Sequence, residues 1–257
     1  MSTRWDPEQY ERFKAARDRP ALDLLLRIPP ELDPREVWDL GCGTGEHAAL
    51  LKRRHPRAVV HGLDSSPDML AQARRRPEAV DWREAKVQDW RPETAPDLIF
   101  TNAALQWLPD HAALFPRLAG ALAPGGVFAC QMPMSHAAPW HAAMREVAAD
   151  GPWAGALEGV EGVRPLARPE DYYAWLSPFS AVEIWSTTYL HALHGDDAVV
   201  DWMLGSGLRP YLERLDDVLR SAFLDAYRAR LRPLFPKAPD GATLLPFPRL
   251  FLLCRRG

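Results

Sequence analysis

The sequence predicts an α/β fold, a doubly wound and mostly parallel sheet of seven strands that carries two helical insertions. Three features of the chain lead to this prediction. In the first half, short apolar runs alternate with segments of helical spacing, which is typical of βαβ units. A glycine-rich loop separates the first predicted strand from the helix that follows it. The second half is less regular, so most of it is expected to form insertions in the chain that builds the sheet domain.

The predicted elements follow one another in a regular order. Strands are predicted at residues 37–40, 58–63, 81–84, 98–102, 126–132, 182–190 and 249–254. Helices are predicted near residues 46–54, 67–75 and 112–122. Ser65 or Ser66 can cap the second of these helices, and Pro67 suits its first position. The sequence APGG ends the third helix and makes a turn before the next strand.

The second half supplies the insertions. Residues 136–153 and 196–234 have helical spacing, whereas residues 155–169 are rich in glycine and proline and are expected to form a loop. Ligands of open α/β sheets bind outside the carboxyl ends of the strands. We therefore expect one domain over residues 1–257, with helical insertions at about 133–180 and 195–245 that form a lid.

Composition and charge exclude several classes of protein. The chain has 257 residues, of which 47% are hydrophobic, and its net charge of -3 does not favour nucleic acid as a partner. There is no signal segment and no apolar run near the roughly 20 residues that span a bilayer. We expect a cytoplasmic protein with no membrane partner, and the composition is compatible with a monomer. Scattered cysteines and histidines without ligand spacing indicate neither a disulfide framework nor a metal site.

The glycine loop DLGCGTG is the first candidate site. Its glycines are Gly41, Gly43 and Gly45, and Glu46 stands where the dinucleotide motif G-x-G-x-x-G has its last glycine. A carboxylate at that place would repel a diphosphate. Asp39, at the end of the preceding strand, could accept a hydrogen bond from an ammonium group. The loop alone is weak evidence, but it favours a ligand with a cationic amino-acid end.

Asp64 ends the second predicted strand and is the next candidate. Its carboxylate can accept hydrogen bonds from both hydroxyls of a ribose, and the alternative is that it caps the following helix. Met69 on that helix could lie against an adenine ring or belong to the core. The full set of candidate cofactor-binding residues is Asp39, Gly41, Gly43, Gly45, Asp64, Ser65, Met69, Val87, Asp89, Asn102 and Ala103.

DLGCGTG resembles motif I of the class I S-adenosylmethionine-dependent methyltransferases, in which the loop wraps the amino-acid end of the cofactor. The resemblance implies a Rossmann-like fold, S-adenosyl-L-methionine as co-substrate and S-adenosyl-L-homocysteine as product. After the third strand this family usually has an acidic residue that binds the adenine amino group. Lys86 stands there in this chain, so either the backbone around Val87 or the side chain of Asp89 must take that role.

The segment DLIFTNAALQWLPDH resembles the part of this family that lies beneath the sulfonium and opens into the substrate site. It contains Asn102, Gln106 and Trp107, although Trp107 could instead be a packing aromatic. Stretches over nearly the whole chain, among them NAALQWLPDHAALFPRL, QMP, IWSTTYLH, DWMLGSGLRPYL and FPRLFLLCRR, resemble the trans-aconitate methyltransferases within this class. That resemblance implies methylation of one carboxylate of trans-aconitate to give a monomethyl ester.

Esterification of a carboxylate asks little of the protein chemically. A carboxylate is ionised and nucleophilic near neutral pH, so neither a general base nor a metal is required and no catalytic residue is expected. Positioning remains, and the other carboxylates of a tricarboxylic acid need cationic anchors. Arg209 is favoured, because it stands between apolar neighbours in a Gly-Leu-Arg-Pro turn. The other candidates for positioning and substrate binding are Arg17, Arg19, Tyr10, Gln106, Trp107, Arg145 and Tyr211.

Three alternatives stay open at this level. The acceptor could be another small or carrier-linked carboxylate. The protein could be a nicotinamide-dependent dehydrogenase, which the glycine spacing and Asp39 oppose. It could also be a binding protein that keeps the nucleoside pocket without catalysis.

Overall fold

The structure, a computed structural model, describes residues 14–257, apart from the side chains of Lys14, Ala15, Arg17 and Ser180. The chain divides into two compact units. The sheet unit consists of residues 19–133, 167–187 and 249–257, and the insertion unit contains residues 14–18, 134–166 and 188–248. No helix in residues 14–257 is long and apolar enough to cross a membrane.

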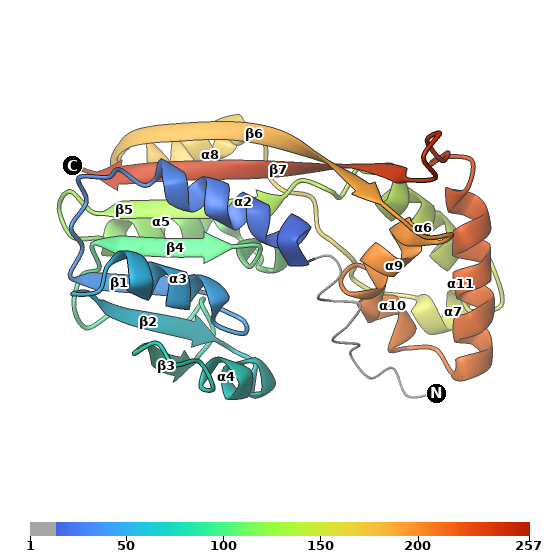
Figure 1. Ribbon diagram of the computed structural model, residues 1–257, viewed down its shortest axis with the longest axis horizontal. Coiled ribbons are helices and arrows are strands. Elements are labelled where there is room, and N and C mark those ends of the chain that lie inside the picture. Colours follow the sequence, from blue (N-terminus) through green and yellow to red (C-terminus); the bar gives the residue numbers. More distant parts are fainter. Residues whose placement is uncertain (1–13) are drawn as a thin grey trace. The chain divides into compact units, whose positions relative to one another are not determined.

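Within the described residues the strands form a seven-stranded sheet of order β3-β2-β1-β4-β5-β7-β6 (Figure 1). The first five are parallel to their neighbours, and β7 is antiparallel to β5. The strands are β1 Glu36–Leu40, β2 Val59–Asp64, β3 Asp81–Glu84, β4 Leu98–Asn102, β5 Val127–Pro133, β6 Ser180–Leu193 and β7 Thr243–Arg256. The strand order reverses between β1 and β4, which is where open α/β sheets bind ligands. The predicted fold class is confirmed.

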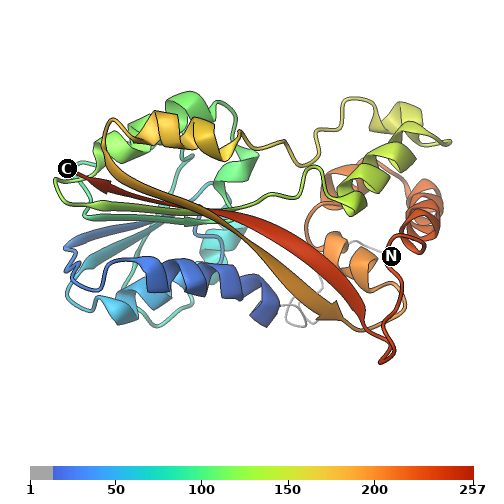
Figure 2. The ribbon, with the colours of Figure 1, turned by 90° about the horizontal axis from the view of Figure 1, so that it is seen from above.

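Helices cover both faces of the sheet in the sheet unit (Figure 2), which explains why β1, β4 and β5 are buried almost throughout. Helices α2 and α3 lie on one face, and α5 and α8 lie on the other. These elements, with α4 and the short 3-10 helix η1, are α2 Lys14–Arg27, α3 Glu46–Arg54, α4 Pro67–Ala73, η1 Leu105–Trp107, α5 His111–Ala121 and α8 Pro169–Leu176.

Helix α4 shows how the sequence sets a local boundary. Ser66 is its N-cap and accepts a hydrogen bond from the Met69 backbone N–H, and Pro67 occupies the first turn. Ser65 is exposed. Of the two predicted caps, Ser66 is therefore the one that caps the helix.

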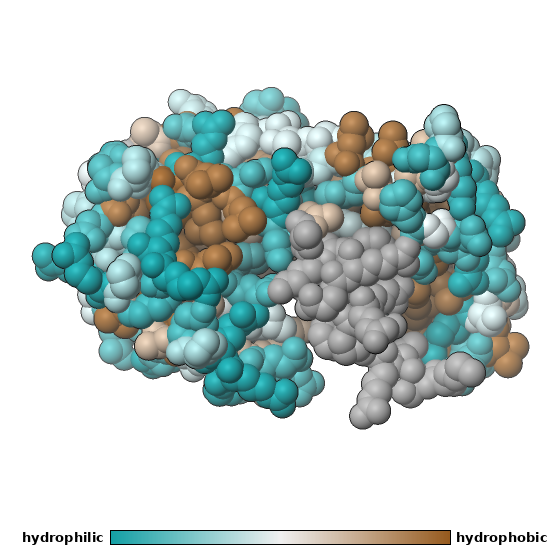
Figure 3. Space-filling view, viewed as in Figure 1, coloured by the Kyte–Doolittle hydropathy of each residue, from teal (hydrophilic) through white to brown (hydrophobic). Residues whose placement is uncertain are grey.

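Helix α2 buries one side and exposes another. Leu24 and Ile28 are fully buried, whereas Leu22 and Leu26 are 43% and 78% exposed. Figure 3 shows hydrophobic residues gathered on the surface where α2 lies. The Arg27 guanidinium stands 5.3 Å from the ring centroid of Trp185, which belongs to β6. The sequence analysis does not predict this helix.

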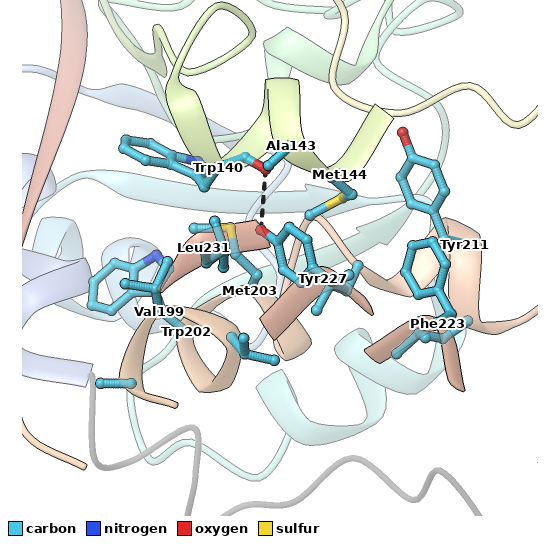
Figure 4. Packing of buried hydrophobic residues seen from close by; sticks show 14 of the residues in the cluster. Trp140, Ala143, Met144, Val199, Trp202, Met203, Tyr211, Phe223, Tyr227 and Leu231 are labelled. Carbon is cyan, nitrogen blue, oxygen red and sulfur yellow. Dashed lines mark hydrogen bonds between the residues drawn. The ribbon is translucent and has the colours of Figure 1, made fainter. Parts of the chain in front are cut away.

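The insertion unit has a core of its own (Figure 4). Its helices are α6 Pro139–Ala149, α7 Ala154–Leu157, α9 Ala198–Leu204, α10 Arg209–Leu212 and α11 Asp217–Leu231. Trp140, Trp202 and Phe223 are almost fully buried there, and the Tyr227 hydroxyl donates a hydrogen bond to the Trp140 carbonyl at 3.1 Å. This unit is held together by aromatic packing and by that buried bond.

Four expectations about the elements need correction. Residues 196–234 form α9, α10 and α11 rather than continuous helix, because turns interrupt them. Helix α8 is not among the predicted elements and begins where the expected loop at 155–169 ends. The start of that expected loop is part of α7. Residues 167–187 belong to the sheet unit, so the first inserted segment is shorter than expected. Strand β7 begins at Thr243, earlier than predicted, because Pro246 and Pro248 argue against a strand there. Its pairing with β5 starts after these prolines, at Arg249. The lid remains a prediction.

Candidate functional site

The glycine loop connects β1 to α3, and its three glycines have positive φ angles of 75°, 53° and 78°. A Cβ atom on Gly41 would stand 2.3 Å from the Ala104 Cβ, so glycine there allows the loops after β1 and β4 to meet. A Cβ atom on Gly43 would meet no atom of the described residues within 4 Å. Gly43 therefore borders open space, where a ligand can approach the backbone.

Asp39 lies at the base of this loop and is 1% exposed. Its Oδ2 atom has no hydrogen-bond partner among the described residues. Burial is the largest of the causes that together raise the pKa of Asp39 to about 8; a hydrogen bond from the Ala48 backbone opposes this rise, and the charge of Asp64 adds to it. A cation beside this carboxylate would favour its ionised form. The site suits a cationic amino-acid end better than a diphosphate.

Glu46 contributes less to that choice than the sequence suggests. Its Oε1 atom is 3.4 Å from the Arg76 guanidinium, and Arg76 also donates a hydrogen bond to the Thr44 carbonyl at 2.6 Å. The positive charge of Arg76 offsets the negative charge of Glu46. The argument against a diphosphate therefore rests on Asp39.

The carboxylate of Asp64 is held by backbone groups on both sides. It accepts hydrogen bonds from the Gly43 N–H at 2.8 Å and from the Ser66 N–H at 2.9 Å. A carboxylate has about four acceptor positions, so both oxygens can still accept from ribose hydroxyls. The alternative role of Asp64 as the cap of α4 is filled by Ser66. Met69 is half-buried on this helix.

The turn after β3 is fixed by an arginine that the sequence analysis missed. Arg117 on α5 donates hydrogen bonds to the carbonyls of Val87 and Trp90, both at 2.8 Å. Val87 is buried, whereas Lys86 and Asp89 are exposed. The structure thus gives the Val87 backbone a fixed position, and the adenine contacts of Val87 and Asp89 remain predictions.

The turn after β4 contains a residue in an unusual conformation. Ala103 has a φ angle of 52°, a left-handed geometry that costs a residue with a side chain about 1 kcal/mol. Its N–H donates to the Gln131 carbonyl at 2.9 Å, and its carbonyl accepts from the Gln106 amide at 2.6 Å. Gln106, which is 4% exposed, therefore supports this turn with the amide that was expected to bind substrate. Trp107 is 46% exposed, so it is not a packed core aromatic.

The side chains of His111 and Tyr172 also support the turn after β4. His111 donates through Nε2 to the Leu105 carbonyl at 2.9 Å, and its Nδ1 accepts from the Tyr172 hydroxyl at 2.6 Å. Burial lowers the pKa of His111, which favours the neutral ring that this arrangement requires. Burial also raises the pKa of Tyr172. Tyr172 belongs to α8, which the sequence analysis does not predict, and no sequence signal links it to His111.

Two of the predicted substrate residues, Arg145 and Tyr211, belong to the insertion unit. The charge of Arg145 acts on Tyr211 and opposes the rise in its pKa that burial causes. Arg145 is exposed and donates to the His136 carbonyl at 2.9 Å. Tyr211 is 5% exposed. A guanidinium and a phenol hydroxyl are groups that can bind a carboxylate, and the role of these two residues in substrate binding stays a prediction.

Arg209 differs from the expectation that singled it out. It is the first residue of α10, and its Nε atom lies 2.6 Å from Glu213 on the surface of that helix. The argument that it avoids a charged helix face is therefore wrong, and its contact with substrate stays a prediction. Arg19 is exposed. Tyr10 and the side chain of Arg17 lie outside the described residues.

Two buried polar residues at this edge of the sheet were missed. Gln131 on β5 is 0% exposed and Arg249 on β7 is 5% exposed. Each interrupts an otherwise apolar strand, and that interruption is the signal that could have found them. In residues 14–257 no cluster of three or more His, Cys, Asp or Glu side chains is arranged to hold a metal.

Comparison with known proteins agrees with this geometry. A family model described as "Methyltransferase domain" matches residues 37–126, which contain the glycine loop and the turns after β2, β3 and β4. The chain is similar to the solved structure of phosphoethanolamine N-methyltransferase 2 from Haemonchus contortus, with a TM-score of 0.55 and 17% identity. That match covers 93% of this chain and about half, 53%, of the other. It supports the fold.

Curated relatives match almost the whole chain. The trans-aconitate 2-methyltransferase of Methylobacterium nodulans is 49% identical over 254 residues, which is 98% of each protein. The enzyme of the same name from Azoarcus sp. is 46% identical over 253 residues, 98% of this chain and 99% of the relative. Identity at this level extends through the insertion unit as well as the sheet. The chain belongs to the trans-aconitate 2-methyltransferase family of class I methyltransferases.

Proposed function

We propose that the protein transfers the methyl group of S-adenosylmethionine to a carboxylate of trans-aconitate, forming the monomethyl ester and S-adenosyl-L-homocysteine. The observation that carries this proposal is the 49% and 46% identity to two proteins named trans-aconitate 2-methyltransferase over nearly their full length. Because the match includes the insertion unit, it bears on the acceptor as well as on the methyl donor.

The residues at the glycine loop fit this methyl donor. The buried carboxylate of Asp39 suits the positively charged amino-acid end, and the open space at Gly43 allows close approach to the backbone. Asp64 keeps acceptor positions for the ribose hydroxyls. When bound, S-adenosylmethionine supplies a methyl group activated by the neighbouring sulfonium.

The reaction balances without a proton transfer. A carboxylate oxygen forms a bond to the methyl carbon, the bond between carbon and sulfur breaks, and its electron pair stays on sulfur. An ionised carboxylate needs no general base near neutral pH. The protein must align the reacting atoms and exclude water, and such orientation can supply several kcal/mol.

The remaining carboxylates of the acceptor require positive or hydrogen-bonding partners. Arg145 and Tyr211 are proposed contacts in the insertion unit, where the charge of Arg145 acts on Tyr211. Arg209, Arg17 and Tyr10 remain further proposed contacts. The cysteines Cys42, Cys130 and Cys254 are free buried thiols, which is in keeping with a reducing compartment such as the cytoplasm. We take the acting form to be a monomer.

The direct test uses the purified full chain with methyl-labelled S-adenosylmethionine. Trans-aconitate, cis-aconitate, citrate and propane-1,2,3-tricarboxylate are offered separately, and label in the acid is tested for release by mild base. We expect base-labile label in trans-aconitate at the highest kcat/KM of the panel. Transfer to none of these acids would overturn the proposal, and preferred transfer to a carrier-linked acid would replace its acceptor.

A further inference from the structure

We propose that Gln131 and Arg249 form a subsite that binds one of the carboxylates of the acceptor that is not methylated. This inference rests on the proposed function for the identity of the acceptor. It rests on the structure for the place of the subsite, which lies entirely within the sheet unit.

Strand register places three polar residues in a row. Asn102 of β4 is paired with Gln131 of β5, so their side chains share one face of the sheet. Gln131 is paired with Phe251 and Pro133 with Arg249, which makes Gln131 and Arg249 diagonal neighbours on that face. Diagonal neighbours in an antiparallel pair are roughly 7 Å apart, within reach of long side chains.

The same face carries the candidate cofactor site. Asp39 of β1 is paired with Phe100 of β4, two residues before Asn102, so Asp39 and Asn102 point to the same side. Gln131 follows one strand beyond Asn102, and Arg249 lies one strand further still. Neighbouring strands are about 5 Å apart, so the row extends away from the donor site by roughly the length of a small polycarboxylic acid.

The buried amide of Gln131 is the observation that indicates a ligand. The side chain is 0% exposed, and neither Nε2 nor Oε1 has a hydrogen-bond partner within the part of the chain that the structure describes. The Oδ1 atom of Asn102 is also buried and has no hydrogen-bond partner among the described residues, although the residue as a whole is only partly buried. A buried polar group without a partner costs about 1–3 kcal/mol, and native proteins keep few of them without a reason.

The positive charge of Arg249 favours a negatively charged ligand. Its guanidinium is 5% exposed and brings a permanent positive charge to this row. A carboxylate can accept hydrogen bonds from the fork of a guanidinium and from the Nε2 of a glutamine at once. An apolar ligand would leave the buried Gln131 amide without a partner. The chemistry therefore matches an anionic, planar group such as a carboxylate.

The test compares steady-state kinetics of the wild type with Gln131→Met and Arg249→Lys. Methionine keeps the length of glutamine but removes the donor, and lysine keeps the charge but removes the fork. We expect the KM for trans-aconitate to rise about 10-fold or more in each, as the loss of a hydrogen bond to a charged group implies. The Kd for S-adenosylmethionine should change less than twofold.

Thr101→Val is the matched control. Thr101 is also 0% exposed, and its hydroxyl likewise has no partner in residues 14–257, but it precedes Asn102 and points to the opposite face of the sheet. This variant removes a buried polar group without touching the row. It should leave the KM for trans-aconitate within twofold of the wild type. An equal rise in Thr101→Val would show that the effect is structural and would overturn the subsite.

A series of shortened acceptors separates binding from general damage. Mesaconate, itaconate and glutaconate each lack a different one of the three carboxylates of trans-aconitate. The difference between wild type and Gln131→Met should disappear for the acid that lacks the carboxylate held by the subsite. If the difference persists for all three, or if both variants keep the wild-type KM, the subsite is wrong while the proposed function stands.

Failure of the proposed function gives a different result. In that case the wild type methylates none of these acids. The subsite is then tested by the thermal shift that trans-aconitate causes in the presence of S-adenosyl-L-homocysteine. A shift in the wild type that is lost in Gln131→Met supports a carboxylate subsite, and no shift in either protein refutes it.

Discussion

Among single residues, Gly43 and Gly125 form a natural pair for testing the loop. Both have positive φ angles, 53° and 78°, and within residues 14–257 a Cβ atom on either would meet nothing within 4 Å. Alanine at either position should therefore cost a similar strain of about 1 kcal/mol. Only Gly43 belongs to the glycine loop, the candidate cofactor site.

We predict that Gly43→Ala weakens binding of S-adenosylmethionine about 10-fold, which corresponds to 1.4 kcal/mol. Gly125→Ala should leave binding unchanged. The two variants should lower the melting temperature by similar amounts. Calorimetric titration and thermal unfolding of both variants check this. Equal binding losses in the two would show that strain alone, rather than ligand approach, is responsible.

Asp39 should couple cofactor binding to a proton. Its pKa of about 8 lies above its ordinary value of 3.8, so the carboxyl is mostly protonated at pH 7 before binding. A positively charged ligand beside it favours the ionised form, so binding should release about one proton and should weaken as the pH falls below 8. Titration calorimetry at pH 7 in buffers of different ionisation enthalpy measures this release.

Asp39→Asn is the control for that measurement. The variant cannot ionise, so it should bind S-adenosylmethionine more weakly and exchange no proton. Proton release that persists in Asp39→Asn would assign the coupling to another group. Taken by itself, the titration of Asp39 lowers the free energy of unfolding of the ligand-free protein as the pH rises from about 4 to 8, because the folded pKa of this group is the raised one.

At the level of the elements, the hydrogen bond between α8 and α5 supports the turn beneath the expected sulfonium. Removing the Tyr172 hydroxyl leaves His111 Nδ1 buried without its donor, at a cost of about 1–2 kcal/mol. We predict that Tyr172→Phe lowers the melting temperature by roughly 2–6 °C, whereas Tyr173→Phe, at a position that is 54% exposed, lowers it by less than about 1 °C. Thermal unfolding of the two variants decides; equal effects would mean that the bond to His111 adds no stability.

The elements themselves differ in how well the sequence predicts them. Helix α3 and strands β3 and β4 match their predicted ranges, because each is bounded by its own turn or cap residues. Helix α2 was not predicted. Helix α8 has such signals, with Pro169, Glu170 and Asp171 in its first turn, but it directly follows a segment rich in glycine and proline that was expected to be a loop. Strand β7 is longer than expected, because Pro246 and Pro248 lie outside its pairing with β5. Local signals predict elements well where nothing distant overrides them.

For the whole molecule, stability should fall in mildly acidic solution because of histidines that are buried neutral. The pKa of His141 is lowered to about 4, chiefly by burial and then by the charges of Arg145 and His136. A folded pKa below the unfolded value of about 6.5 means that its contribution is complete above pH 6.5 and is lost as the pH falls towards 4. The pKa values of His55 and His111 are also lowered.

We predict that urea unfolding of the wild type shows a free energy of unfolding that declines between pH 6.5 and pH 4.5. His141→Gln should be less stable at pH 7 but should show a smaller decline over this interval. The difference between the two proteins isolates His141, since Asp39 contributes with the opposite sign and is common to both. Parallel pH profiles would show that His141 does not titrate in this way.

The sequence by itself determined the fold class and the family, and it predicted which loop would hold the cofactor. These follow from residues that are close together in the chain: DLGCGTG with Asp39 before it, Asp64 at the end of the next strand, and the turn after β4. Short motifs of this kind keep their chemistry because the strand and helix on either side fix their geometry locally.

Only the tertiary structure decided the rest of the site. Burial raised the pKa of Asp39, Arg76 offset the charge of Glu46, and Tyr172 met His111 across two helices. Gln131 and Arg249 became neighbours through the register of β5 with β7, strands that are far apart in the chain. The physical reason is common to all: desolvation and pairing depend on which distant segments pack together, and residue order along the chain does not contain that information in any local pattern.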